Sequence, residues 1–259
     1  MKRSYRYLPQ LLLSAIVAVA ALICNAESNK PQNRKPSLEQ AKADYARADK
    51  SLNTAWEELQ KTPDKRRFES LRWDQRRWIG YRDYFSGEVV MRDYNIPAGK
   101  LKQRLEHWQS MTDITRQRLD ILRSIISARK KQLELTGIWS DGYGGYLNIV
   151  TLGDGKIAFS IDVVRGPTHH LGSLGGLAKQ NGDIIRFTDA ETKSKGDKET
   201  AWLTEIRRAD HIEVITANAQ PYCGARAYFD GDYYRIGDLR KIQRERMLKA
   251  VRGQSGDKE

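Results

Sequence analysis

Between residues 38 and 133 the apolar side chains recur every three or four residues, which is the period of an amphipathic helix. The first stretch contains Leu38, Ala41, Tyr45, Ala48, Leu52, Ala55 and Leu59. The second contains Phe68, Leu71, Gln75, Trp78 and Arg82, and the third contains Leu101, Leu105, Trp108, Thr112, Thr115, Leu119, Leu122, Ile126 and Leu133. Pro63 and residues 96–99 separate the stretches. The spacing therefore predicts three helices that form an antiparallel bundle over residues 38–136.

At Gly137 the pattern changes to short runs rich in β-forming residues. These runs cover residues 144–150, 156–164, 170–179, 184–189, 201–207 and 211–216. Glycine, aspartate and asparagine between them are typical of tight turns. Closing such strands into a barrel removes exposed edges, and ~100 residues suffice for eight strands. We therefore predict an α+β chain whose helices are followed by a small antiparallel β-barrel over residues 137–237, with a basic helix and tail over residues 238–259.

The first 26 residues have the pattern of a secretory signal peptide. Lys2, Arg3 and Arg6 precede an apolar run over residues 11–23, and small side chains precede a cleavage site after Ala26. The run is shorter than the ~20 residues of a membrane-spanning helix, so retention as an anchor is the less favoured alternative. Cleavage leaves a flexible polar leader, residues 27–37, and places the protein in the periplasm or outside the cell.

Charge is distributed unevenly along the chain. The sequence has 45 Lys and Arg against 33 Asp and Glu, a formal net charge of +12. Residues 27–136 hold 24 basic and 16 acidic side chains, whereas residues 137–237 hold 11 and 13. Two interpretations stay open: the basic helices are simply solvated, or they are attracted to an anionic envelope surface. Export and the lack of a nucleic-acid-binding motif argue against a nucleic-acid partner.

The second predicted helix contains Gln75, Trp78, Tyr81, Arg82 and Asp83, and the third contains Thr115 and Arg118. The pattern Gln-x-x-Trp-x-x-Tyr-Arg-Asp followed by Thr-x-x-Arg-x-x-x-Leu resembles the LprI-type domain, over residues 38–135. The family is named after a lipoprotein that inhibits lysozyme, and the resemblance implies a small helical module with that activity. Family members often carry a disulfide, which this chain lacks.

The physics of the motif leaves two roles open. Gln75, Trp78 and Arg82 share one helix face with apolar residues, so they either form an interhelical polar network with Thr115 and Arg118 or present a ligand surface. Asp83 points about 100° away from Arg82. We therefore expect it to pair with Arg118 or another residue of the facing helix.

The second half of the chain opens on Gly137 and Trp139, a spacing that resembles lipocalin-like barrels and the MliC-type lysozyme inhibitors. Neither resemblance supplies inhibitory residues for this chain. Residues 141–145 combine glycines with Asp141 and Tyr143, which suits an exposed contact loop as well as an ordinary hairpin turn.

The sequence carries no recognisable catalytic motif, and we expect no enzyme, no cofactor and no metal site. His169 and His170 would face opposite sides of a strand and could not chelate one ion together. Cys223 is the only thiol after cleavage, and is either a small buried side chain or an intermolecular disulfide partner.

These observations favour an exported, non-catalytic envelope protein that inhibits lysozyme by occlusion, with a lysozyme or another envelope protein as its partner. The alternative is a lipocalin-like barrel that binds a small ligand or envelope component, with the basic helices as a surface anchor. Because many lysozymes are basic, we expect the mildly acidic barrel to lead the approach.

Overall fold

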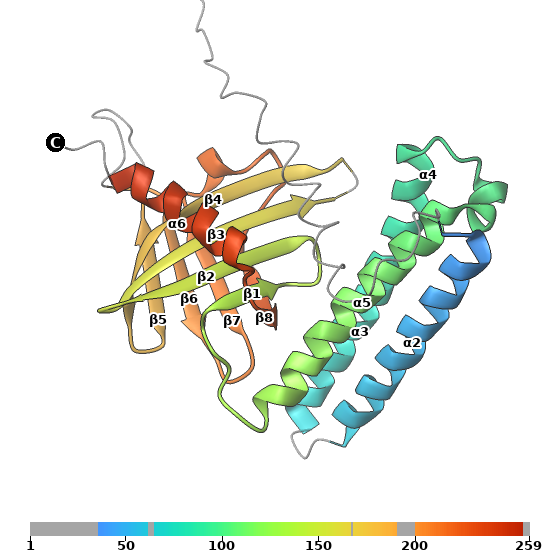
Figure 1. The fold of residues 1–259 in the computed structure, drawn as a ribbon, viewed down its shortest axis with the longest axis horizontal. Helices are drawn as coiled ribbons and strands as arrows, with labels where there is room; N and C mark the ends of the chain where they lie inside the picture. Colours follow the sequence, from blue (N-terminus) through green and yellow to red (C-terminus); the bar gives the residue numbers. More distant parts are fainter. Residues whose placement is uncertain (1–35, 62–64, 167, 191–199, 256–259) are drawn as a thin grey trace, which may run out of the picture. The chain divides into compact units, whose positions relative to one another are not determined.

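The computed structural model describes residues 36–61, 65–166, 168–190 and 200–255, and Leu38–Glu259 form one compact unit (Figure 1). The predicted signal peptide, its cleavage site at Ala26 and leader residues 27–35 lie outside the described residues. None of the described helices combines the length and apolar character needed to cross a membrane.

Helices occupy the first half of the compact unit. They are α2 (Leu38–Gln60), α3 (Lys65–Tyr84), the π-helix η2 (Phe85–Val89), α4 (Val90–Asp93), the 3₁₀ helix η3 (Ala98–Gln103) and α5 (Leu105–Ala128). The predicted faces are the buried ones: α2 buries Leu52 and Leu59 against Leu122 of α5, and α3 contributes Leu71 and Trp78 to the same core. The α3 and α5 helices face the barrel, and α2 lies on their far side (Figure 1).

The simple three-helix bundle expected from the sequence is only partly present, because short helical segments join the long helices. At Phe85 the chain leaves α-helical geometry for η2, and the hydroxyl of the next residue, Ser86, donates a hydrogen bond of 2.7 Å to the Arg82 carbonyl oxygen. The α5 helix ends at Ala128 rather than near Leu133. Leu133 instead packs on the barrel core, so tertiary contacts override the helical spacing there.

Eight antiparallel strands form a closed barrel in sequence order, with β1 paired to β8. The strands are β1 (Gly137–Ser140), β2 (Gly145–Gly153), β3 (Lys156–Arg165), β4 (His170–Asn181), β5 (Ile184–Thr188), β6 (Trp202–Arg207), β7 (Ile212–Ala217) and β8 (Gly231–Gly237), with the 3₁₀ helix η4 (Gln220–Tyr222) before β8. Closure satisfies the backbone groups that an open sheet would expose at its edges. The α+β architecture and the antiparallel barrel predicted from the sequence are thus present.

Side chains that alternate along the strands fill the barrel interior. Leu147, Phe159 and Tyr233 are fully buried in one apolar cluster with Trp139 at its base. Gly176 of β4 makes room for this packing, because a β-carbon there would lie 2.5 Å from the ring of Phe187.

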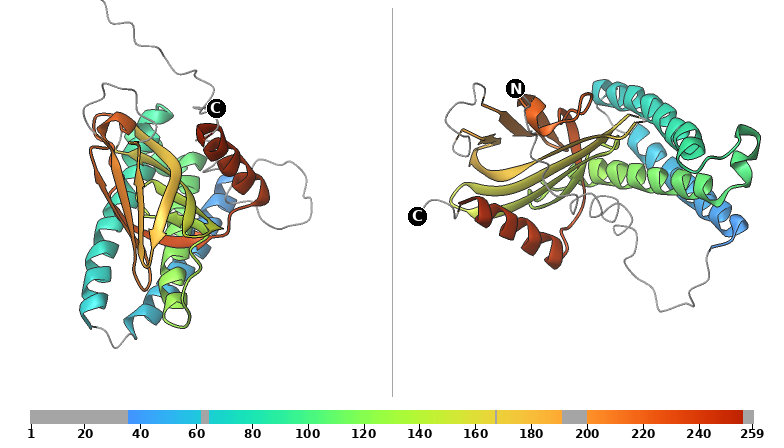
Figure 2. Two further views of the ribbon diagram at one scale, coloured as in Figure 1. Left: turned by 90° about the vertical axis from the view of Figure 1, so that its left-hand side faces the viewer. Right: turned by 90° about the horizontal axis from the view of Figure 1, so that it is seen from above.

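The C-terminal helix α6 (Lys241–Ser255) lies across the outer face of the barrel (Figure 2). Met247 packs there against Val150 and Ala158, the outward-facing apolar residues of β2 and β3. The basic C-terminal segment is therefore docked over at least part of its length.

Candidate functional site

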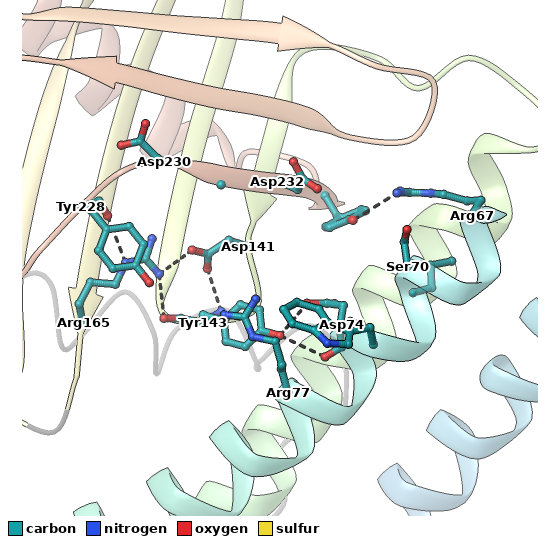
Figure 3. Close-up of a pocket in the computed structure, with 14 residues that line it drawn as sticks. Arg67, Ser70, Asp74, Arg77, Asp141, Tyr143, Arg165, Tyr228, Asp230 and Asp232 are labelled. Carbon is teal, nitrogen blue, oxygen red and sulfur yellow. Dashed lines mark hydrogen bonds and ion pairs between the residues drawn. The ribbon is translucent and has the colours of Figure 1, made fainter.

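A cleft of ≈ 440 Å³ lies between α3 and one end of the barrel, and we call it the α3–barrel cleft (Figure 3). It is lined by Arg67, Ser70, Leu71, Trp73, Asp74, Arg77, Asp141, Tyr143, Arg165, Tyr228, Asp230, Gly231, Asp232 and Tyr234. Cations, carboxylates and aromatic rings alternate along its walls. Such a surface suits the recognition of a polar partner more than that of an apolar one.

The α3 side of the cleft follows from helix geometry. Arg67, Asp74 and Arg77 lie three or four residues, or multiples of these, apart and so share one face. The Asp74 carboxylate accepts a hydrogen bond of 2.7 Å from the Tyr143 hydroxyl. On its other side, Arg118 Nη2 lies 2.8 Å from Asp74 Oδ2, an ion pair that lacks hydrogen-bond geometry. Asp74 thus connects α5, α3 and the barrel.

The loop proposed as an exposed contact loop is instead folded against α3. Asp141 is only 8% exposed, and its Oδ1 accepts 2.8 Å hydrogen bonds from the backbone N–H groups of Tyr143 and Gly145. Gly144 has φ +91°, and a β-carbon there would lie 2.4 Å from the Val164 carbonyl oxygen. The loop joins β1 to β2, and the aromatic side chain of Tyr143 packs against α3 and is therefore half-buried.

Arg165, at the end of β3, holds the barrel side of the cleft together. Its Nη1 lies 2.5 Å from Asp141 Oδ2 and donates a 2.9 Å hydrogen bond to the Tyr143 carbonyl oxygen. Its Nε donates a 3.1 Å hydrogen bond to the Tyr228 carbonyl oxygen, and its guanidinium carbon lies 4.5 Å from the centre of the Tyr228 ring (Figure 3). The charge of this buried side chain is therefore matched, and the loops at this end of the barrel are fixed.

A second contact between α3 and the barrel lies at the other end of the cleft. Arg67 donates to Asp210 with an Nη2–Oδ2 distance of 2.7 Å, and His211 Nδ1 lies 2.7 Å from Asp210 Oδ1. Burial opposes ionisation of Asp210, but the hydrogen bond from His211 and the charge of Arg67 lower its pKa overall. Burial also raises the pKa of Tyr234, which lies beside Arg67, to about 12.

Three residues of the predicted motif come together between the helices. Arg118 is 1% exposed, and its Nε donates a 2.8 Å hydrogen bond to Gln75 Oε1. Its guanidinium carbon lies 5.6 Å from the centre of the buried Trp78 ring. Because Asp74 is the neighbour of Gln75, this network reaches the floor of the α3–barrel cleft.

The other motif residues lie apart from this network. The sequence led us to expect that Asp83 would pair with Arg118 or another residue of the facing helix. Asp83 pairs instead with its neighbour Arg82, whose Nη2 lies 2.8 Å from Asp83 Oδ1. Asp83 faces solvent, whereas the carboxylate that meets Arg118 lies nine residues earlier. Thr115 is fully buried, and its hydroxyl has no hydrogen-bond partner among the described residues. Tyr81 packs edge-on against Tyr143 at a centroid distance of 5.3 Å.

Sequence reasoning missed Asp74, Arg165 and Tyr228. The alternation in β3 could have found Arg165, because Ile157, Phe159, Ile161 and Val163 face the interior at every second position before it. Asp74 precedes Gln75 directly. Nothing in the sequence indicated that Tyr228 would stack on Arg165.

Three carboxylates of the cleft are engaged by other groups of the chain. Asp74 and Asp141 meet arginines, and Asp230 accepts hydrogen bonds from the backbone and hydroxyl of Thr216, at 2.8 and 2.6 Å. These side chains are therefore held in contacts within the chain. Across the residues that the structure describes, no three His, Cys, Asp or Glu side chains are grouped to hold a metal ion.

A family model described as "Lysozyme inhibitor LprI" matches residues 24–122. The helical part of the chain is thus similar to LprI-type domains. The matched range includes both parts of the motif, the first on α3 and the second on α5, and it ends within α5, before the barrel. No curated protein and no solved structure matches the chain. The α3 wall of the cleft thus lies in the part of the chain that the family model matches, and the other wall belongs to the barrel.

Proposed function

We propose that this protein is exported and inhibits a lysozyme by occluding the groove in which the enzyme binds its glycan. The match of residues 24–122 to the lysozyme-inhibitor family carries this proposal. Asp74 and Asp141 are each paired with an arginine, which supports a partner-binding surface. The basic signal-like segment at residues 1–26 supports export, and N-terminal sequencing of secreted material should find Glu27 first.

The mouth of the α3–barrel cleft is the surface that best fits a lysozyme groove. Trp73 and Tyr228 are 61% and 53% exposed, and large exposed aromatic side chains are typical anchors of protein interfaces. The guanidinium carbon of Arg77 lies 4.7 Å from the centre of the Trp73 ring. Glycosidases of this kind hold two carboxyl groups in the groove, so an arginine presented on an aromatic side chain has complementary charge.

The barrel wall supplies the charge that a basic partner requires. Asp230 and Asp232 lie beside Tyr228 at the cleft, and the side chain of Asp232 is 49% exposed. Acidic groups beside the anchor reduce repulsion between the basic helices and a basic lysozyme and steer the approach. This orientation agrees with the expectation that the barrel end leads.

A turbidity assay of cell-wall lysis tests the proposal with matched variants. The full chain should slow lysis, and Arg77→Gln and Trp73→Ala should each weaken inhibition by roughly tenfold or more, as truncation of an interface anchor does. Arg76→Gln removes the same charge one position along α3, and Trp202→Ala removes a tryptophan that is 46% exposed on the barrel. Both controls should inhibit as the parent does. Equal loss in the controls, or no inhibition by the parent, would contradict the proposal.

The alternative of a lipocalin-like small-ligand barrel has less support. Trp139, Phe159 and Tyr233 belong to a closely packed cluster inside the barrel, where a lipocalin-type ligand would otherwise lie. The second part of that alternative, attachment of the basic helices to an anionic surface, is tested by binding to anionic vesicles, which salt should weaken.

A further inference from the structure

A second pocket, of ≈ 390 Å³, lies against the C-terminal end of α3, and we call it the aromatic pocket. It shares Tyr143, Arg165 and Tyr228 with the α3–barrel cleft, but its other walls are different. They include Tyr81 and Tyr84 of α3. This volume falls in the range of small-molecule sites.

The rings on α3 form one continuous wall. The centroids of Tyr81 and Phe85 lie 4.4 Å apart at an interplanar angle of 40°, and those of Tyr84 and Phe85 lie 5.8 Å apart at 81°. All three side chains are half-buried and so keep part of their surface open to the pocket. Phe85 also begins the π-helix, a distortion that occurs often at functional sites. The wall offers flat apolar faces to a ring-shaped ligand.

The charge in the aromatic pocket is entirely positive. None of the residues that line it is acidic. Arg165 is already occupied by Asp141, whereas Arg226 is exposed and has no carboxylate within ion-pair distance among the described residues. An arginine without a partner beside aromatic rings suits a carboxylate, which it can bind through two parallel hydrogen bonds.

The tyrosine hydroxyls of the aromatic pocket discriminate between a ligand ring without hydrogen-bonding groups and a ligand ring that carries hydroxyl groups. The hydroxyls of Tyr81 and Tyr84 form no hydrogen bond with any described residue, and Thr168 Oγ1 lies 2.8 Å from His170 Nε2. A ligand ring without hydrogen-bonding groups would leave the tyrosine hydroxyls unpaired when it displaced water, which is unfavourable. A ring with its own hydroxyl groups would satisfy them.

We infer that the aromatic pocket binds a sugar acid, with the sugar ring on the wall of Tyr81, Tyr84 and Phe85 and the carboxylate on Arg226. Arg226 lies outside the lining of the α3–barrel cleft, so its variants test this site separately from inhibition of lysozyme.

Titration of the full chain by calorimetry or ligand-observed NMR tests the inference with four probes. N-acetylmuramic acid and glucuronic acid carry both features, N-acetylglucosamine lacks the carboxylate, and benzoate lacks the hydroxyls. We expect at least one sugar acid to bind at least tenfold more tightly than either of the last two. If N-acetylglucosamine bound as tightly as the sugar acids, the role of charge would be overturned. If benzoate bound as tightly as the sugar acids, the role of the hydroxyls would be overturned. If neither sugar acid bound, the site itself would be overturned.

Matched variants locate the binding. Arg226→Gln should weaken binding of the sugar acid about tenfold, and Arg186→Gln, at an exposed arginine of β5, should leave it unchanged. Tyr84→Ala should likewise weaken binding, and Tyr94→Ala, at an exposed tyrosine after α4, should not. Because Arg226 is exposed, its variant should melt like the parent. Unchanged affinity in a folded Arg226→Gln variant would overturn the assignment.

Discussion

Glu205 places a carboxyl group inside the barrel with nothing to neutralise it. It lies on β6 opposite Ile185 and Val214, is fully buried, and neither of its oxygens has a hydrogen-bond partner among the described residues. Burial disfavours the charged form and raises its pKa to about 8. The side chain is therefore protonated in the folded protein at neutral pH and ionised in the unfolded chain.

The sign of the effect follows from proton binding. Above the unfolded pKa of about 4.3, the folded state holds a proton that the unfolded state has lost, so stability falls as pH rises toward 8. The slope is about 1.4 kcal/mol per pH unit. Between pH 5 and pH 7 this one group should lower the free energy of unfolding by roughly 3 kcal/mol.

Urea unfolding of the parent and of Glu205→Gln at pH 5 and pH 7 measures this contribution. The glutamine cannot ionise, so the variant should gain roughly 3 kcal/mol relative to the parent between the two pH values. The comparison cancels the contributions of other titrating groups. Glu213→Gln, on the neighbouring strand and outside the core, removes an exposed ion pair with Arg208 and should change stability by about 1 kcal/mol or less. A parent and Glu205→Gln variant with the same pH dependence would refute the reasoning.

Three further outcomes follow from the packing. Arg118→Leu should destabilise the protein by about 3 kcal/mol in urea unfolding, because it leaves Asp74 without its buried partner; a loss below about 1 kcal/mol would contradict a structural role. Met247→Ala should cost about 2 kcal/mol and increase hydrogen exchange in α6, and unchanged exchange would mean that the helix is held otherwise. Burial raises the pKa of the Cys223 thiol, so peptide mapping should find it alkylated more slowly at pH 7 in the folded protein than in urea; equal rates would contradict this.

The periodicity of the sequence was sufficient to predict most of the fold. The two-residue alternation predicted the barrel, because the burial of one face of a strand fixes its register with its neighbours. Six of the eight strands lie on the predicted runs. The buried faces of the helices were predictable because apolar residues recur there every three or four positions. The π-helix at Phe85–Val89 was not, because the period of apolar residues does not encode a local change of backbone hydrogen bonding within a helix.

The candidate site was less predictable, because it depends on contacts between distant parts of the chain. Helical spacing placed Gln75 and Trp78 on one face but could not show that Asp74, rather than Asp83, meets Arg118. The glycine-rich loop suited both a contact loop and a hairpin turn by its sequence, and its burial depends on where α3 lies. Such pairings require three-dimensional proximity between residues tens of positions apart.

The proposed function requires that this protein cover the glycan groove of a lysozyme. Direct binding of the full chain to an active lysozyme, with and without a chitin oligosaccharide that fills the groove, tests it most directly. Occlusion predicts one-to-one binding that the oligosaccharide competitively displaces. Binding that is indifferent to a filled groove, or no binding at all, would contradict the account.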